Sequence, residues 1–342
     1  MKMKQAHLLA ILFLMIAFSC KEKTTDEKDK KVVINSAENA YSKTAALDSL
    51  IELNPDNSNL YYQRSRYYYD RKLFPKALID ILYATQLDSK NIAAYLLAGD
   101  IYIAMGQGQD AIDIMNEAIN NNQGNEILYE RAVEYNFYMK NIQSAMNFAN
   151  DLLKINKNNA NAYFFKGLIH KENNIDKAIS NFQTAVEQDP TYYNAYMQLA
   201  TLFSKKNDKM AIQYYDNALR LQAKSREAIY GKGYFYQQQK QFNKAKSEYK
   251  ILIIENRGDY QAIFNMAHCF LAQDSLKKAE SHFNMAVSAK PDYVDAIYMQ
   301  GQIAERLGDI VSAKILYQNA LKMLPGNETI LQSLKEIKAK EQ

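Results

Sequence analysis

One alanine recurs along the chain at almost constant spacing, and this regularity constrains the fold more than any other feature. The intervals between successive members are 34, 34, 33, 33, 34, 34 and 34 residues. The members are Ala77, Ala111, Ala145, Ala178, Ala211, Ala245, Ala279 and Ala313. A period of this length indicates an array of similar structural units, because each unit must repeat the same buried contacts.

A second set of mostly small residues keeps step with the alanines, each member following an alanine by 22 residues. Including the residue that precedes the first alanine, the set is Ser65, Gly99, Val133, Gly167, Ala200, Gly233, Ala267 and Gly301. The two shortened repeats lose their residue between Gly167 and Ala178 and between Ala200 and Ala211. We expect a turn at both places, because changes in chain length are tolerated best there.

Hydrophobic periodicity within one repeat predicts two antiparallel helices. Tyr95, Gly99 and Tyr102 fall on one face of a first helix, and Ala111 and Ala118 fall on one face of a second. Small residues at the contact let the two backbones approach closely, and a larger side chain there would cost about 1–3 kcal/mol by overpacking. With 11 Gly and 5 Pro in 342 residues, the chain has few of the turn residues that a protein of many strands needs.

A stripe of large residues also occurs once per repeat, and we interpret it as core. Its members are Tyr61, Tyr95, Tyr129, Tyr163, Tyr196, Ile229, Ile263 and Ile297. Cys269 lies in the middle of a predicted helix, and we expect it to behave as a small buried hydrophobic residue.

The spacing and residue types together resemble the tetratricopeptide repeat (TPR) family. Gly301, Ala313, Tyr317, Ala320 and Pro325 carry the resemblance in the last repeat. It covers about residues 58–327 and implies an all-α helical solenoid of about eight helix-turn-helix repeats that form a superhelix. A leading helix is expected at 35–57 and a capping helix at 328–342. The departures are Val133 at a small position, and Leu152 and Leu252 in place of a later alanine.

The amino terminus has the order of a secretory signal peptide, which we assign to residues 1–19. Lys2 and Lys4 precede an apolar run over 8–18, which is too short to span a bilayer. The ending Ser19-Cys20 resembles the bacterial lipobox, which implies diacylation of Cys20 and a lipid anchor in the membrane. An ordinary signal peptide followed by a chance cysteine is the alternative.

Residues 20–34 are expected to form the lipidated cysteine and a charged tether. The stretch 21–31 reads KEKTTDEKDKK and offers no aliphatic or aromatic side chain for burial. The absence of Asp at Lys21 resembles lipoproteins that are sorted to the outer membrane. The sequence therefore predicts a lipid-anchored protein of the cell envelope. The anchor would lie on either the periplasmic or the surface face of the outer membrane.

Charge and motif content argue against two classes of function. The net charge of +4 includes two lysines of the signal peptide, and no basic stripe of the kind that binds nucleic acid is present. The remaining histidines are His170, His268 and His282, and no metal-binding, nucleophile or phosphate-loop motif accompanies them. We therefore predict that the chain is not an enzyme and has no catalytic residue, no metal site and no cofactor.

The resemblance implies a peptide-binding groove lined by the first helices, and hence envelope proteins or peptides as partners. The residues that it places on or near the groove are Tyr62, Tyr69, Leu96, Phe137, Phe164, Met197, Tyr230, Tyr234, Phe264, His268 and Tyr298. The alternative for each residue is packing between neighbouring repeats. A protein scaffold or adaptor is thus the favoured function, and a glycan- or nutrient-capture lipoprotein is the second. The lack of Trp and of long loops between repeats argues against the second.

Overall fold

The computed structural model describes residues 44–340 of the chain. The predicted signal peptide at 1–19, Cys20 with the tether at 20–34, and part of the leading helix at 35–43 lie outside the described residues. Within residues 44–340, helices are joined by turns and no strand is present. The prediction of an all-α fold is confirmed.

The described chain divides into two compact units between Asn122 and Gln123. Unit 1 holds a helix at residues 44–53 and two helical hairpins, α2 (Ser58–Asp70) with α3 (Phe74–Leu87) and α4 (Ile92–Ala104) with α5 (Gly108–Asn121).

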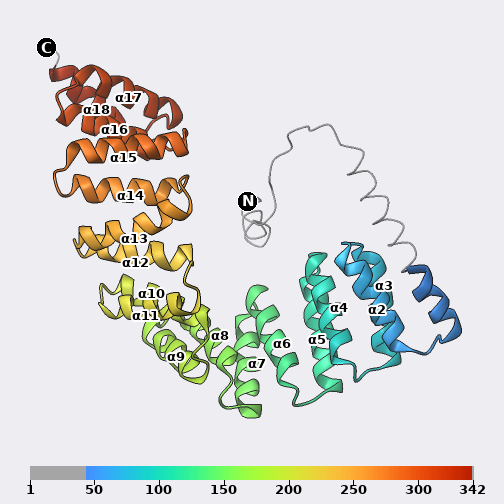
Figure 1. Ribbon diagram of the computed structural model, residues 1–342. Helices are drawn as coiled ribbons and strands as arrows, with labels where there is room; N and C mark the ends of the chain where they lie inside the picture. The colour runs from blue at the N-terminus through green and yellow to red at the C-terminus, as the bar shows by residue number, and fades with distance from the viewer. Residues whose placement is uncertain (1–43, 341–342) are drawn as a thin grey trace. The chain divides into compact units, whose positions relative to one another are not determined.

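Unit 2 holds six hairpins and a closing helix. The first helices are α6 (Glu126–Tyr138), α8 (Ala160–His170), α10 (Tyr193–Lys205), α12 (Arg226–Gln238), α14 (Tyr260–Leu271) and α16 (Val294–Arg306). The second helices are α7 (Ile142–Ile155), α9 (Ile175–Gln188), α11 (Met210–Leu221), α13 (Phe242–Glu255), α15 (Leu276–Ala289) and α17 (Ile310–Met323), and α18 (Glu328–Lys340) closes the unit. Figure 1 shows the hairpins of each unit following one another in chain order, which confirms a solenoid of about eight hairpins.

Polar side chains fix where most first helices begin. A side-chain oxygen of the capping residue accepts a hydrogen bond from a backbone N–H of the first turn, which stabilises a helix by about 1 kcal/mol. The caps of this kind are Asn57, Asn91, Asn125, Asn159, Ser225 and Asp259. Their regular recurrence keeps successive hairpins in register.

The turn inside each hairpin usually contains one residue in the left-handed conformation. These residues are Lys72, Gly106, Lys140, Asn207, Lys240, Asp274 and Gly308. The hairpin of α8 and α9 has none, and α8 is 11 residues long instead of 13. In the next hairpin α11 begins only one residue before Ala211. The two deletions therefore lie around the turn that joins the two helices of a hairpin, as predicted. Each deletion shortens a helix as well as altering the turn.

The eight marker alanines are all fully buried. Opposite them, small residues make room for large rings: a Cβ built on Gly301 would lie 2.5 Å from the Tyr317 ring, and one on Gly167 would lie 2.6 Å from the Phe182 ring. Such distances leave no space for a methyl group, so the predicted close approach of the helices is confirmed.

Val133, which departs from the small-residue pattern, is 1% exposed and shares a buried cluster with Ala149. Ala149 lies 16 residues after Val133, the same step that separates Gly301 from Tyr317. The large residue of this hairpin is thus on the first helix and the small one is on the second.

The predicted core stripe is buried in part. Tyr95, Ile229, Ile263 and Ile297 are buried, whereas Tyr61, Tyr129, Tyr163 and Tyr196 are half-buried. Two of the half-buried tyrosines pack edge-on against second-helix rings, with centroids 4.6 Å apart for Tyr61 and Tyr83 and 6.2 Å apart for Tyr129 and Phe148.

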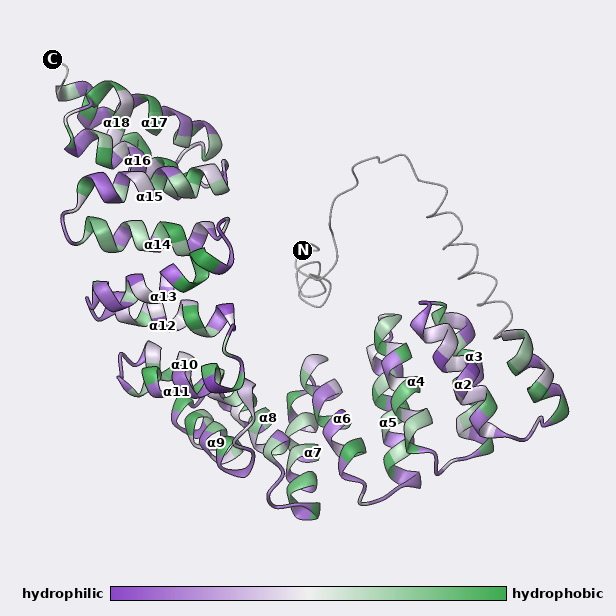
Figure 2. Cartoon of the chain, in the orientation of Figure 1, coloured by the Kyte–Doolittle hydropathy of each residue, from purple (hydrophilic) through white to green (hydrophobic). Residues whose placement is uncertain are grey.

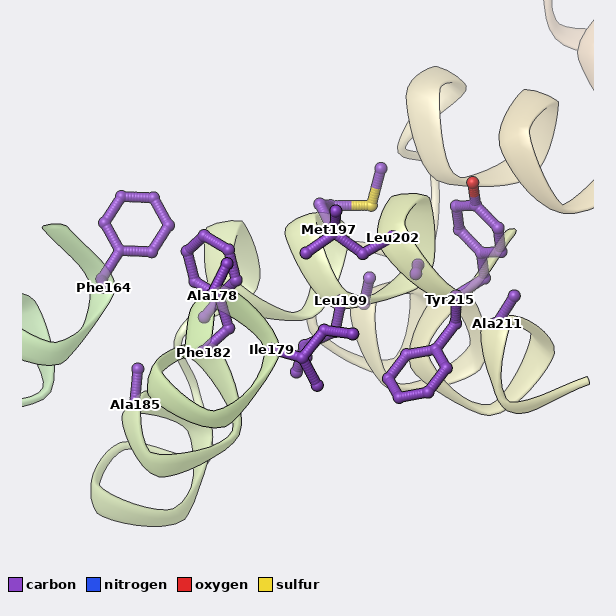
Figure 3. Close-up of a cluster of buried hydrophobic side chains, with 14 of the residues drawn as sticks. Phe164, Ala178, Ile179, Phe182, Ala185, Met197, Leu199, Leu202, Ala211 and Tyr215 are labelled. Carbon is purple, nitrogen blue, oxygen red and sulfur yellow. The ribbon is translucent and has the colours of Figure 1, made fainter. Parts of the chain in front are cut away.

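The largest described cluster of buried residues runs through the middle of unit 2. Figure 3 shows Phe164, Phe182, Leu199 and Tyr215 as parts of this cluster, which draws on several consecutive helices. Figure 2 shows hydrophobic and hydrophilic residues mixed along the helices, as expected when each helix buries only one side. Each hairpin therefore depends on its neighbours to cover its apolar side.

We expect Gly301→Ala to destabilise the protein by about 1–3 kcal/mol, because the new methyl group overpacks against the Tyr317 ring. Urea denaturation followed by circular dichroism measures the change. The cost should shrink in a Tyr317→Leu background, and the helix-propensity gain of Ala cancels between the two backgrounds. An equal cost in both backgrounds would contradict the contact.

Candidate protein-binding surface

All eleven residues predicted for the groove lie on first helices. In unit 1, Tyr62, Tyr69 and Leu96 are half-buried. Tyr69 packs against Phe74 with ring centroids 5.8 Å apart, and Tyr62 lines a cavity beside the helix at 44–53. Leu96 lies on α4, which contacts α2.

Three of the predicted residues in unit 2 serve mainly to pack hairpins together. Phe164 and Met197 are only 8% and 5% exposed. The Phe164 ring lies 4.9 Å from Tyr192 and Phe137 lies 5.5 Å from Phe165, centroid to centroid. The packing alternative therefore describes Phe164 and Met197, and both belong to the core cluster rather than to an open surface.

Four other predicted residues lie on the neighbouring first helices α12 and α14, two on each helix. Tyr234 is 44% exposed, and Tyr230, Phe264 and His268 are half-buried. The two helices contact each other. Tyr298, on α16, lies apart from this group in its contacts: its ring packs against Tyr317.

Two tyrosines that sequence reasoning missed extend the group. Tyr293 lies directly before α16. Its ring centroid is 4.9 Å from that of Phe264 and 5.0 Å from that of Tyr260, the first residue of α14. A tyrosine at the start of a first helix was the available signal, and it recurs at Tyr192 and Tyr193. We call the resulting set the aromatic surface; it consists of Tyr230, Tyr234, Tyr260, Phe264, His268 and Tyr293.

Polar contacts between α12 and α14 hold the aromatic surface in shape. Asn265 Nδ2 donates a hydrogen bond of 2.6 Å to the Tyr230 hydroxyl. Arg226 forms two hydrogen bonds of 2.7 and 2.8 Å with the buried carboxylate of Asp259, and its guanidinium lies 5.3 Å from the centre of the Tyr230 ring. A bidentate arginine–carboxylate pair is rigid, so it fixes the spacing of the two first helices.

Burial shifts the pKa values of three ionisable groups on this surface toward the uncharged form. It raises the pKa of Tyr230, and it raises the pKa of Tyr293 to about 12 together with the nearby charge of Asp295. Burial also lowers the pKa of His268, and Asp295 opposes that shift in part. The surface therefore offers aromatic faces and hydroxyl groups without formal charge.

Within residues 44–340, no three His, Cys, Asp or Glu side chains are grouped so that they could hold a metal ion. The His268 ring packs between Phe264 and Phe283, at 4.5 and 5.2 Å. Cys269 is fully buried, as predicted, and burial raises the pKa of its thiol to about 11.

Comparison with known proteins identifies the architecture. Residues 92–125 match the family model described as tetratricopeptide repeat. The C-terminal part of a TPR repeat-containing protein from Cytophaga hutchinsonii superposes with a TM-score of 0.60 at 20% identity, covering 69% of this chain and 98% of that one. The fold is a TPR solenoid. None of the helices within the described part combines the length and apolar character needed to cross a bilayer.

Two curated relatives also resemble this TPR solenoid in sequence. The TPR repeat-containing protein MJ1428 of Methanocaldococcus jannaschii is 23% identical over an alignment of 290 residues, which covers 72% of this chain and 48% of the relative. The BBSome complex member BBS4 of Mus musculus is 29% identical over 142 residues, which are 41% of this chain and 27% of the relative. The chain thus spans less than half of the length of each of these relatives.

The lowered pKa of His268 predicts a pH-dependent stability. The unfolded chain, with a histidine pKa of about 6.5, takes up a proton more readily than the folded protein, so stability falls as pH drops below about 6.5. We expect wild type to lose more stability than His268→Phe between about pH 7.5 and about pH 5. Asp295→Asn removes the opposing charge and should steepen the loss. Parallel pH profiles of wild type and His268→Phe would contradict the assignment.

Proposed function

We propose that the protein is a scaffold or adaptor lipoprotein of the bacterial cell envelope, and that it binds a protein partner through the aromatic surface. The observation that supports this most is the chain of ring contacts that joins Tyr260, Phe264, His268 and Tyr293, with Tyr230 and Tyr234 on the neighbouring first helix α12. TPR solenoids offer the first-helix side to peptides and proteins, which agrees with this placement.

The chemistry of the aromatic surface favours a protein segment as its ligand. Aromatic side chains bury a large area and lose little conformational entropy on binding, so they act as anchors in protein interfaces. The surface carries no formal charge of its own near neutral pH. Apolar side chains of a partner would therefore contact the rings, while its backbone N–H and C=O groups would meet the tyrosine hydroxyls.

The membrane anchor in this proposal is Cys20, which lies outside the described residues. The lipobox resemblance of Ser19-Cys20 supports diacylation, and two acyl chains are enough for stable attachment to a bilayer. The tether at 21–31 spans roughly 20 Å by random-coil scaling. The residue type at Lys21 supports the outer membrane as the site of attachment in this proposal.

We expect a photo-crosslinking amino acid at Tyr234 to capture a discrete protein partner in intact cells. The matched control carries the same amino acid at Ile254, which is 68% exposed on the second helix α13. The proposal predicts a specific adduct at position 234, lost when Phe264→Ala is added, and none at position 254. Equal labelling at both positions would refute it, and bound oligosaccharide without protein would favour glycan capture.

The two cysteines of the chain give a direct test of the anchor. Cys20→Ser should release the protein from the membrane fraction into the soluble fraction, because the acylated residue is lost. Cys269→Ala, which changes the other cysteine, should leave the protein with the membrane. Fractionation followed by immunoblotting measures both, and membrane retention of Cys20→Ser would contradict lipidation.

A further inference from the structure

An open cavity of about 460 Å³ lies at the amino-terminal end of unit 1. It is lined on one side by the helix at 44–53 and on the other by α2; the residues are Ala46, Leu47, Leu50, Tyr62, Gln63, Arg66, Tyr67, Asp70 and Arg71. Leu50 is 45% exposed there. The lining thus combines leucine and tyrosine side chains with the charged side chains of Arg66, Asp70 and Arg71.

A recurring polar contact identifies the helix at 44–53 as a second helix. In unit 2, a residue of a first helix bonds to a residue 16 positions earlier, on the second helix of the preceding hairpin. The pairs are Lys166 with Asn150, Lys232 with Asp216, and Gln300 with Asn284, at 2.9, 2.8 and 2.7 Å.

In unit 1, Arg64 of α2 bonds to Asp48 at 2.7 Å with the same step of 16 residues. Residues 44–53 thus take the place of a second helix ahead of α2. The first helix that belongs with them would contact both this helix and α2, because consecutive first helices such as α2 and α4 touch. The cavity lies between those two elements, which is the place such a first helix would fill.

The repeat register says which part of the chain reaches this place. A shift of 34 residues back from α2 gives residues 24–36. In this register Val33 corresponds to Tyr67, Ile101 and Tyr135, all of which are buried. Residues 24–31 are charged or polar and have nothing to bury, whereas 32–34 reads Val-Val-Ile.

We propose that Val32, Val33 and Ile34 of the same chain occupy this cavity and cover the exposed side chain of Leu50. The segment is joined to the helix at 44–53 by only nine residues, 35–43, so its effective concentration at the cavity is high. The occupant leaves residues 21–31 as the free tether. If Cys20 is the lipid anchor proposed above, the tether then joins the solenoid at the α2 end of unit 1.

Disulfide formation between introduced cysteines tests this in the full-length chain carrying Cys20→Ser and Cys269→Ala. Gln63→Cys, in the cavity lining, is paired either with Val33→Cys or with Thr25→Cys in the tether. For a free chain, loop closure over 30 or 38 residues differs by only about 1.4-fold in probability. We expect the pair with Val33→Cys to close at least about tenfold faster than the pair with Thr25→Cys.

Equal rates for the two pairs would overturn the proposal, and so would disulfide-linked dimers, which would mean that a second copy of the chain fills the cavity. Hydrogen exchange gives an independent readout. Val33→Asp should speed exchange of the 44–53 backbone relative to Thr25→Asp, because the cavity loses its cover. Unchanged exchange in Val33→Asp would contradict the docking. Both readouts are independent of partner binding by the aromatic surface.

Discussion

The contact between a small residue on one helix and a large side chain on the other, inside each hairpin, is the constraint on which the rest of the structure depends. Gly167 leaves no space for a methyl group beside Phe182, and Val133 pairs its larger side chain with Ala149. Because a small residue faces a larger one at these contacts, the two helices of a hairpin can approach each other closely. Each hairpin therefore presents nearly the same apolar side to its neighbour.

The elements of the fold could be predicted because this contact leaves a periodic trace in the sequence. Ala111 and Ala313 are both fully buried because they hold the same position in their hairpins. The regular spacing of the marker alanines between them therefore locates the turns. The two deletions were located correctly, but their effect on α8 and α11 was not foreseen. A missing residue can be absorbed by a turn or by a helix end, and periodicity alone does not distinguish the two.

The candidate site was only partly predictable, because contacts between hairpins join residues that no simple period relates. Phe164 and Met197 occupy the same repeat position as Tyr230, yet they are nearly buried. Phe164 meets Tyr192, a residue from the turn before the next hairpin, and such a partner is not visible in the pattern of a single repeat. Tyr293 was missed for the same reason.

Polar side chains in this protein hold neighbouring helices together. Within residues 44–340, every buried side-chain nitrogen or oxygen has a hydrogen-bond partner. Arg226 and Asp259 tie consecutive first helices together, and Arg64 ties α2 to the helix before it. Polar side chains thus hold the array in register, and the partner is proposed to contact exposed Tyr234 and the half-buried rings beside it.

Site-resolved hydrogen exchange of unit 2 tests most directly the claim that each hairpin is stabilised by its immediate neighbours. We expect protection to be highest in the interior hairpins, from α8 to α13, and to fall stepwise toward α18, with the two helices of a hairpin opening together. A single opening free energy shared by α10 and α18 would contradict it, because such uniform protection requires one indivisible core.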